Sequence, residues 1–280
     1  MADHRATKAD LMIAGQLAWE NELRNAWDNH EFSLYYQPIF NVKTNTLVGF
    51  EALIRWLHPA CGNIAPSTFI PVAEKSDFII PLGQWITTMA CQQVHQWNRT
   101  FQSLFRISVN VSARQIAFGN LATMVDDVLR QTGLPADCLE LELTEGMVFE
   151  PEDTVTSDLY HLHEQGVRLA IDDFGTGYSS FRYLSDFPID TLKIDRSFVA
   201  NITKSHKHEM ITATMIVLAK KLDITCIAEG VETSQQVAFL RDKGCDVMQG
   251  YYYGYPMCAT DCEHFIRKLF TTSVRHVSTM

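Results

Sequence analysis

The stretch FSLYYQPIFNVKTNTLVGFEALIRW, residues 32–56, contains two β-rich runs separated by a short polar segment. The runs cover residues 32–40 and 46–56, so only residues 41–45 lie between them. A crossover between parallel strands needs about a dozen residues or more, and this spacing therefore predicts an antiparallel hairpin. One of the two strands must run against the direction of its other neighbours.

Six further β-rich runs follow, and segments with helical periodicity lie between them. The runs cover residues 105–111, 138–145, 167–173, 190–195, 224–229 and 245–249, and the helical segments include 123–131, 154–165 and 209–222. Repeated strand–helix units form a parallel sheet, and eight such strands are the number that closes a barrel. The sequence thus predicts an α/β barrel with one antiparallel strand.

The length of the chain suits a single domain of this kind. It has 280 residues, of which 46% are apolar, and one α/β barrel needs roughly 250 residues. We expect a leader or linker helix within residues 1–29, the barrel over residues 30–270 and a loose polar tail over residues 271–280.

The charge and cysteine content indicate where in the cell the protein acts and which partners it does not bind. A formal net charge of −10 disfavours nonspecific binding to polymeric nucleic acid or to anionic membranes. The seven cysteines form no CxxC pair, which favours reduced thiols over a disulfide framework. No apolar run approaches the roughly 20 residues of a membrane span. We expect a cytoplasmic protein, or the cytoplasmic domain of a larger one.

Polar side chains recur near the carboxyl ends of the predicted strands, where barrel enzymes carry their chemistry. They are Glu51, Asn110, Glu142, Glu145, Asp172, Asp173, Lys193, Asp195, Glu229, Glu232 and Gln249. A single acidic residue at a strand end is more often a helix cap, an ion-pair partner or a solvated group. Several carboxylates at one barrel mouth, however, repel one another unless cations or protons neutralise them. The set as a whole therefore favours a metal site.

The donor types indicate which metal. Oxygen ligands from Asp, Glu and Asn select hard ions such as Mg²⁺ or Mn²⁺ over zinc or copper. Consecutive residues of a regular strand point to opposite faces, so the joint use of Asp172 and Asp173 requires the strand to end there. Gly175 and Gly177 follow and suit either a mobile loop or an ordinary turn. The chain has no GxxxxGK loop and no GxGxxG after a strand, which argues against nucleoside triphosphates and NAD.

Seven segments resemble, in order and over about residues 30 to 257, the motifs of the EAL-domain phosphodiesterase family: EALIRWLHP, SVNVS, LELTE, DDFGTGYSS, LKIDRSF, AEGVET and QGYYYG. The resemblance implies a modified TIM (β/α)8 barrel with one antiparallel strand. It also implies hydrolysis of cyclic-di-GMP to linear 5′-pGpG with two Mg²⁺ or Mn²⁺ ions, and a homodimer. The leader ENELRNAWDNHEF resembles the junction that follows a sensory or diguanylate cyclase domain in larger relatives.

The resemblance also assigns residues to roles. It implies that Glu51, Asn110, Glu142 and Asp172 bind the first metal, and that Asp172, Asp173 and Glu229 bind the second. Lys193 resembles the lysine that contacts the attacking water, with Asp195 as its acidic neighbour, and the catalytic set comprises Lys193, Glu229, Asp195 and Glu51. Gln37, Leu53, Arg55 and Gln249 resemble substrate-binding residues, and Glu145 resembles the glutamate that tethers the DFGTG loop. The departures are Asp77, where the family often has glycine, and Tyr253 and Tyr255.

Two other functions compete with hydrolysis of the dinucleotide. The first is a receptor that binds cyclic-di-GMP in the same pocket without turnover. The second, more distant, is a barrel glycoside hydrolase in which Glu142 or Glu145 acts with Glu229 as paired carboxylates. Such a hydrolase needs no metal, so Asp172, Asp173 and Lys193 would have no purpose in it.

Overall fold

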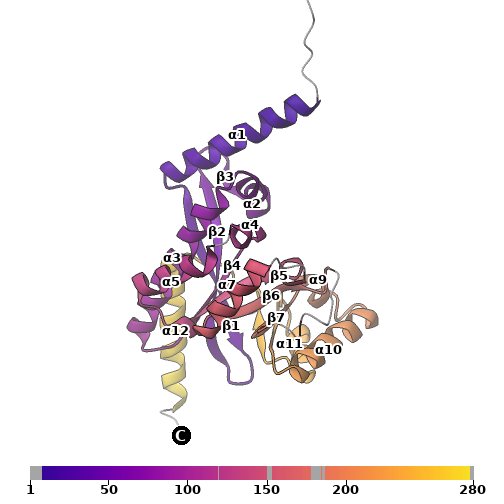
Figure 1. Ribbon diagram of the computed structural model, residues 1–280. Coiled ribbons are helices and arrows are strands. Elements are labelled where there is room, and N and C mark those ends of the chain that lie inside the picture. Colours follow the sequence, from indigo (N-terminus) through magenta and orange to yellow (C-terminus); the bar gives the residue numbers. More distant parts are fainter. Residues whose placement is uncertain (1–7, 119, 150–152, 178–183, 185–186, 278–280) are drawn as a thin grey trace, which may run out of the picture.

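The computed structural model describes residues 8–118, 120–149, 153–177, 184 and 187–277, and shows a barrel of strands surrounded by helices (Figure 1). The strands are β1 (Phe32–Asn41), β2 (Thr46–His58), β3 (Gly62–Ile64), β4 (Arg106–Asn110), β5 (Leu139–Thr144), β6 (Arg168–Phe174), β7 (Thr191–Ile194), β8 (Thr225–Ala228) and β9 (Val247–Gln249). Their order is β1-β9-β8-β7-β6-β5-β4-β2-β3, and β1 also pairs with β2, which closes the ring.

The strand directions confirm the modified TIM barrel. β1 is antiparallel to both of its neighbours, β2 and β9, whereas the pairs from β2–β4 through β8–β9 are parallel. The side chain of Asn41 fixes the hairpin turn by accepting hydrogen bonds from the backbone N–H groups of Lys43 and Thr44. Each of the eight expected runs forms a strand. The short β3, which pairs with the end of β2 outside the ring, was not expected.

Helices enclose the barrel and include each expected helical segment. They are α1 (Lys8–Asp28), α2 (Pro66–Lys75), α3 (Ile79–Phe101), α4 (Ala113–Ala117), α5 (Leu121–Thr132), α6 (Glu145–Phe149), α7 (Asp153–Glu164), α9 (Arg196–Val199), α10 (His206–Lys221), α11 (Ser234–Asp242) and α12 (Ala259–Val277). On β5, Leu139, Leu141 and Leu143 are fully buried and face the helices, because they alternate with residues that point into the barrel.

The leader helix α1 lies across the open end of the β1–β2 hairpin, opposite its turn and outside the ring (Figure 1). Its second half buries Leu23 and Ala26, and Trp27 makes an edge contact with Phe78 at a centroid distance of 5.7 Å. Trp19 makes a similar contact with Trp56 of β2 at 6.0 Å. These aromatic contacts attach the leader helix to the barrel.

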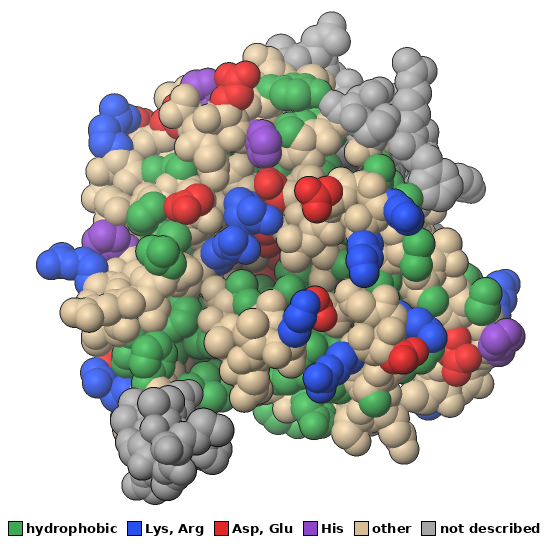
Figure 2. Space-filling model, turned by 90° about the horizontal axis from the view of Figure 1, so that it is seen from below, with side chains coloured by type: hydrophobic (Ala, Val, Ile, Leu, Met, Phe, Trp, Pro, Cys, Tyr) green, Lys and Arg blue, Asp and Glu red, His purple; other side chains and the backbone are tan. Residues whose placement is uncertain are grey.

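The backbone at Asp77 explains why glycine suits this position. Asp77 has a φ of 57°, the left-handed conformation that glycine adopts without strain. On the described part of the face seen from below, acidic and basic side chains are mixed, and no continuous basic surface covers it (Figure 2).

Candidate active site

A buried lysine lies at the centre of the polar cluster at the barrel mouth. Lys193 of β7 is 0% exposed. Its Nζ lies 2.7 Å from Glu142 Oε1, 2.7 Å from Glu229 Oε1, 3.1 Å from Asp172 Oδ1 and 3.9 Å from Glu51 Oε2. The structure therefore brings together side chains that come from five strands or the residues directly after them, because parallel strands of a barrel present their carboxyl ends at one face.

The lysine does not neutralise this cluster. Burial alone lowers the pKa of Lys193, but the surrounding carboxylates raise it well above its usual value, so the side chain is an ammonium ion. Burial and repulsion from neighbouring carboxylates raise the pKa of Glu142 well above its usual range, although Lys193 opposes the shift. Burial likewise raises the pKa of Glu229 to about 8. The excess negative charge must be met by further cations or by protons.

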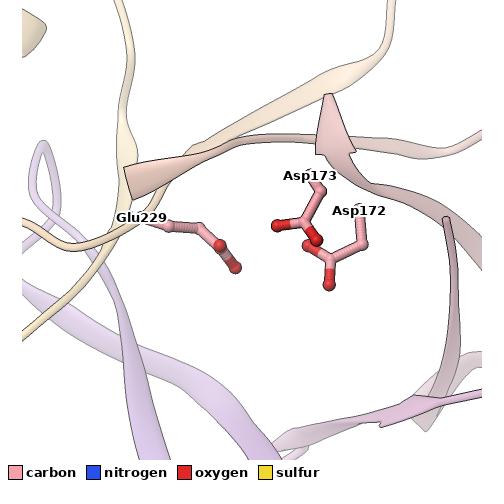
Figure 3. Close-up of side chains that lie close together, drawn as sticks. All are labelled: Asp172, Asp173 and Glu229. Carbon is pink, nitrogen blue, oxygen red and sulfur yellow. The ribbon is translucent and has the colours of Figure 1, made fainter. Parts of the chain in front are cut away.

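Asp172 and Asp173 both reach the site because β6 is irregular there. Its pairing with β7 is interrupted after Ile171 and resumes at Phe174, and Asp173 has a φ of 53°. As expected, the strand ends next to this pair, at Phe174, and a register shift within its last residues changes the alternation of the side chains. Figure 3 shows Asp172, Asp173 and Glu229 pointing toward one another, and each offers a carboxylate oxygen within 4.8 Å of the others.

An amide network holds Glu51 in place. Its Oε1 accepts a hydrogen bond from Asn110 Nδ2 at 2.9 Å, and its Oε2 accepts one from Gln249 Nε2 at 2.5 Å. Gln249 Nε2 also lies 3.2 Å from Gln37 Oε1, and Gln37 Nε2 donates to the carbonyl of Gly254. The network joins β1, β2, β4 and β9, so four site residues expected from distant parts of the sequence form one connected group.

Glu145, at the start of α6, binds the backbone of the DFGTG segment. Its Oε2 accepts hydrogen bonds from the N–H of Gly175 at 3.1 Å and of Gly177 at 3.2 Å, and the residue is 4% exposed. A Cβ on Gly177 would lie 3.2 Å from the Glu145 carboxyl carbon, so glycine suits this close approach. The segment after Gly177, residues 178–183, lies outside the described residues.

The comparison with known protein families agrees with this arrangement. The family model described as "EAL domain" matches residues 20–256. The chain belongs to the EAL domain family.

Relatives and solved structures extend the comparison. This EAL domain is 40% identical over 252 residues to the cyclic di-GMP phosphodiesterase NbdA of Pseudomonas aeruginosa, covering 90% of this chain and 32% of NbdA. It is 41% identical over 251 residues to the signaling protein YkoW of Bacillus subtilis, covering 90% of this chain and 31% of YkoW. The chain thus spans about a third of the length of the curated relatives it matches. The structure of the PaMucR phosphodiesterase in complex with c-di-GMP matches with a TM-score of 0.84 and 37% identity, covering 88% of this chain and 99% of that one.

A cavity of about 190 Å³ opens onto the carboxylates of this EAL domain. Its lining comprises Gln37, Glu51, Leu53, Asp172, Arg196, Glu229, Gly230, Glu232, Gln249, Gly250 and Tyr251. Arg196 and Tyr251 were not expected from the sequence, although each lies within a quoted motif. A second, more apolar cavity of about 490 Å³ adjoins the first, and Leu53 borders both.

Two residues of the expected site, Arg55 and Asp195, lie beside the smaller cavity rather than in its lining, and Arg55 is close enough to Glu51 to interact with it electrostatically. Arg55 does not line the smaller cavity: its Nη1 donates to the carbonyl of Ile54, and its guanidinium lies 5.4 Å from the centre of the Tyr35 ring. Asp195 caps α9 by accepting a hydrogen bond from the N–H of Ser197. Asp195 also contributes, after burial and Asp172, to raising the pKa of Asp173.

The side chains of the cluster fit a divalent cation. Glu142 is 1% exposed, and among the described residues neither of its oxygens accepts a well-aligned hydrogen bond, although Oε1 lies close to Lys193. Asp172 Oδ1 is in the same state. Buried acceptors are normally satisfied, so these oxygens are available to a ligand. An all-oxygen set with excess negative charge suits Mg²⁺ or Mn²⁺.

Proposed function

We propose that this EAL domain is a metal-dependent phosphodiesterase that opens cyclic-di-GMP to linear 5′-pGpG. The observation that carries the proposal is the buried Lys193 ammonium among four carboxylates, several of whose oxygens accept no aligned hydrogen bond from the described residues. The printed names of NbdA and of the PaMucR complex, which refer to cyclic di-GMP, support the choice of substrate.

Two Mg²⁺ or Mn²⁺ ions complete the proposed site. The residues that would hold them are Glu51, Asn110, Glu142, Asp172, Asp173 and Glu229. When bound, such ions lower the pKa of a water molecule and stabilise charge on phosphoryl oxygens. The donor set supports this assignment because it offers oxygen ligands only.

The protein's own residues orient and stabilise the reacting groups. Lys193 keeps its proton, and its positive charge beneath the cavity orients the attacking water and stabilises negative charge as the ester bond breaks. Gln249 and Asn110 hold both oxygens of Glu51, which limits its rotation. Glu145 holds the loop after Asp173, and Gln37 and Leu53 face the substrate from the cavity wall. Asp195 acts indirectly, through Asp173 and the start of α9.

The geometry does not favour a glycoside hydrolase. Glu142 is 1% exposed and lies 2.7 Å from Lys193 Nζ, so a sugar has no access to it. Glu145 is engaged with two backbone N–H groups and is equally inaccessible. Paired carboxylates of a glycosidase must instead reach both sides of the bond that they cleave.

Incubation of the purified protein with cyclic-di-GMP and Mg²⁺ or Mn²⁺, followed by chromatography, tests the proposal. We expect 5′-pGpG to accumulate with metal and to be absent with EDTA or after the substitution Glu51→Ala. Tight binding without product would identify a receptor. Neither binding nor product would reject cyclic-di-GMP as the ligand.

We also propose a cellular location, an oligomeric state and a domain context for this EAL domain. We place it in the cytoplasm, as a homodimer and joined to an upstream sensory or diguanylate cyclase domain. The relatives, about three times as long, and the seven free cysteines support this setting. Among the described helices, none combines the length and apolar character that a membrane crossing requires. Light scattering of the purified protein tests the dimer.

A further inference from the structure

We infer that Arg196 binds a phosphate group of the dianionic ligand at the mouth of the cavity. This inference rests on the proposed function, because it takes the ligand to be a cyclic dinucleotide with two phosphodiester groups. Arg196 would act in substrate binding, at a position that neither the resemblance nor the motif comparison assigned.

The local fold directs Arg196 to the cavity. It is the first residue of α9 and follows Asp195, whose carboxylate caps that helix. The residue is exposed and lines the same cavity as Asp172, Glu229 and Glu232. Its backbone therefore belongs to a capped turn, while its side chain borders the space where a ligand meets the carboxylates.

Gly230 holds the stem of Arg196 in this position. Gly230 directly follows Glu229 and has a φ of 63°. A Cβ placed on it would lie 2.5 Å from Arg196 Cβ and 3.3 Å from Arg196 Cα. Only glycine allows the two backbones to approach this closely, so the position of Arg196 is tied to the segment that carries Glu229.

Among the described residues, the guanidinium of Arg196 has no ion-pair partner. Within the described parts of the chain, no carboxylate lies within ion-pair distance of it, whereas exposed arginines such as Arg114, Arg130 and Arg267 pair with Asp77, Asp127 and Glu263. An arginine without an internal ion pair keeps its planar set of donors for a phosphate, which it binds through two parallel hydrogen bonds.

The charge of the cavity explains why such a group is needed. The lining holds the carboxylates of Glu51, Asp172, Glu229 and Glu232. These groups attract metal ions but repel an approaching dianion. Arg55 interacts electrostatically with Glu51, but it does so from beside the cavity, because its guanidinium contacts the carbonyl of Ile54 and the Tyr35 ring and does not line the cavity. Arg196 is the arginine among the described lining residues that can relieve this repulsion.

Steady-state kinetics with cyclic-di-GMP at saturating Mn²⁺ tests the inference in the wild type, Arg196→Gln, Arg196→Lys and Arg241→Gln. Arg241 is the matched control, because it is also exposed but lies on α11 and does not line the cavity. We expect Arg196→Gln to raise KM by about 10-fold or more, the effect of a lost charged hydrogen bond, with kcat within about 3-fold. Arg196→Lys should be intermediate, because an ammonium keeps the charge without the paired donors. Arg241→Gln should match the wild type.

Two further measurements exclude a merely structural effect. Thermal unfolding and Mn²⁺ titration of Arg196→Gln should match the wild type, and the dependence of kcat/KM on salt should be weaker. An unchanged KM in Arg196→Gln, a fall in its kcat alone, or an equal rise of KM in Arg241→Gln would overturn the inference. The proposed function would still stand in that case, provided that the wild type hydrolyses the dinucleotide. If the wild type binds without turnover, the same comparison is made with Kd. If it neither binds nor hydrolyses the dinucleotide, both conclusions fail.

Discussion

Two glutamates on the same strand, Glu140 and Glu142, occupy opposite situations inside the barrel. They are two residues apart on β5, so both side chains point into the interior, and they are 4% and 1% exposed. Glu140 lies nearer the amino ends of the parallel strands and Glu142 nearer the carboxyl ends. The comparison separates what the barrel needs for stability from what it keeps for chemistry.

The environment of Glu140 satisfies its charge. Its Oε1 accepts a hydrogen bond from Ser108 Oγ at 2.9 Å, and its Oε2 accepts one from Thr191 Oγ1 at 2.6 Å and lies 3.4 Å from Arg168 Nε. Arg168 in turn lies 3.6 Å from Asp190, which accepts a backbone hydrogen bond from Leu169. A buried polar group with such partners contributes to a unique, rigid core.

The environment of Glu142 does not satisfy its charge. It shares one ammonium group with three other carboxylates, and its own oxygens lack aligned donors among the described residues. Uncompensated burial of this kind costs stability and persists where function requires it. The difference between the two glutamates shows that this end of the barrel is arranged for a ligand rather than for the free protein.

The sharpest way to break the comparison is to neutralise Glu142. We expect Glu142→Gln to lower turnover of cyclic-di-GMP by roughly 10³-fold or more, because a charged group of the site is lost. The melting temperature of the metal-free protein should stay the same or rise, since the amide relieves repulsion. Assays of hydrolysis and thermal unfolding check both. A marked fall in melting temperature with retained turnover would show that Glu142 is structural.

The loop contact of Glu145 gives the next largest effect. Glu145→Ala leaves the N–H groups of Gly175 and Gly177 without their acceptor, so the segment after Asp173 loses its anchor. We expect kcat to fall about 10- to 100-fold, the range for residues that orient metal ligands. Kinetics at saturating Mn²⁺ measure this. A kcat equal to that of the wild type would mean that the loop needs no anchor.

Glu140→Gln is the reciprocal test. It weakens the contacts with Arg168 and the two hydroxyl groups, and we expect a loss of about 1 to 3 kcal/mol in the free energy of unfolding. Turnover per folded molecule should stay within about 3-fold of the wild type. Urea unfolding and kinetics on the same preparation measure the two quantities. Lost turnover without lost stability would contradict the division between the two barrel ends.

Removal of metal should reveal the unsatisfied charge as a dependence on pH. Burial raises the pKa of Glu229 from the usual 4.5 to about 8, so the metal-free native state binds more protons than the unfolded state between these values. The contribution of Glu229 to the free energy of unfolding of the metal-free protein should be greatest below pH 4.5. It should fall as the pH rises toward 8, by at most about 1.4 kcal/mol per pH unit. Urea unfolding in EDTA checks this, with Glu229→Gln as the control that should show a smaller slope, since the raised pKa of Glu142 contributes the remainder. Mn²⁺ should also suppress this dependence on pH. A free energy of unfolding that rises between pH 4.5 and 8 in EDTA would contradict the prediction.

The smallest effect is expected far from both glutamates. Arg114 and Asp77 form an ion pair at the surface, with exposed fractions of 52% and 50%. Exposed pairs of this kind contribute little because water and salt screen them. Arg114→Ala should therefore leave both the urea midpoint and kcat unchanged within experimental scatter. A clear change in either would show a role for this surface that the two barrel ends do not explain.

The sequence alone determined the architecture and the identity of the chemical groups. The spacing of the β-rich runs required a hairpin before the parallel strands, because five residues cannot form a crossover, and the polar residues at strand ends favoured a bound cation. Those arguments depend only on local spacing and on charge.

Only the tertiary structure decided how the groups share their surroundings. It placed Lys193 at the centre of the carboxylates, showed the irregular pairing at the end of β6 that lets Asp172 and Asp173 act together, and brought Arg196 into the lining of the smaller cavity. Glu140 and Glu142 belong to one alternating run, and the sequence distinguishes them only by the position of Glu142 nearer the carboxyl end of the strand. Their difference arises from side chains on other strands, and long-range packing alone brings those side chains into contact.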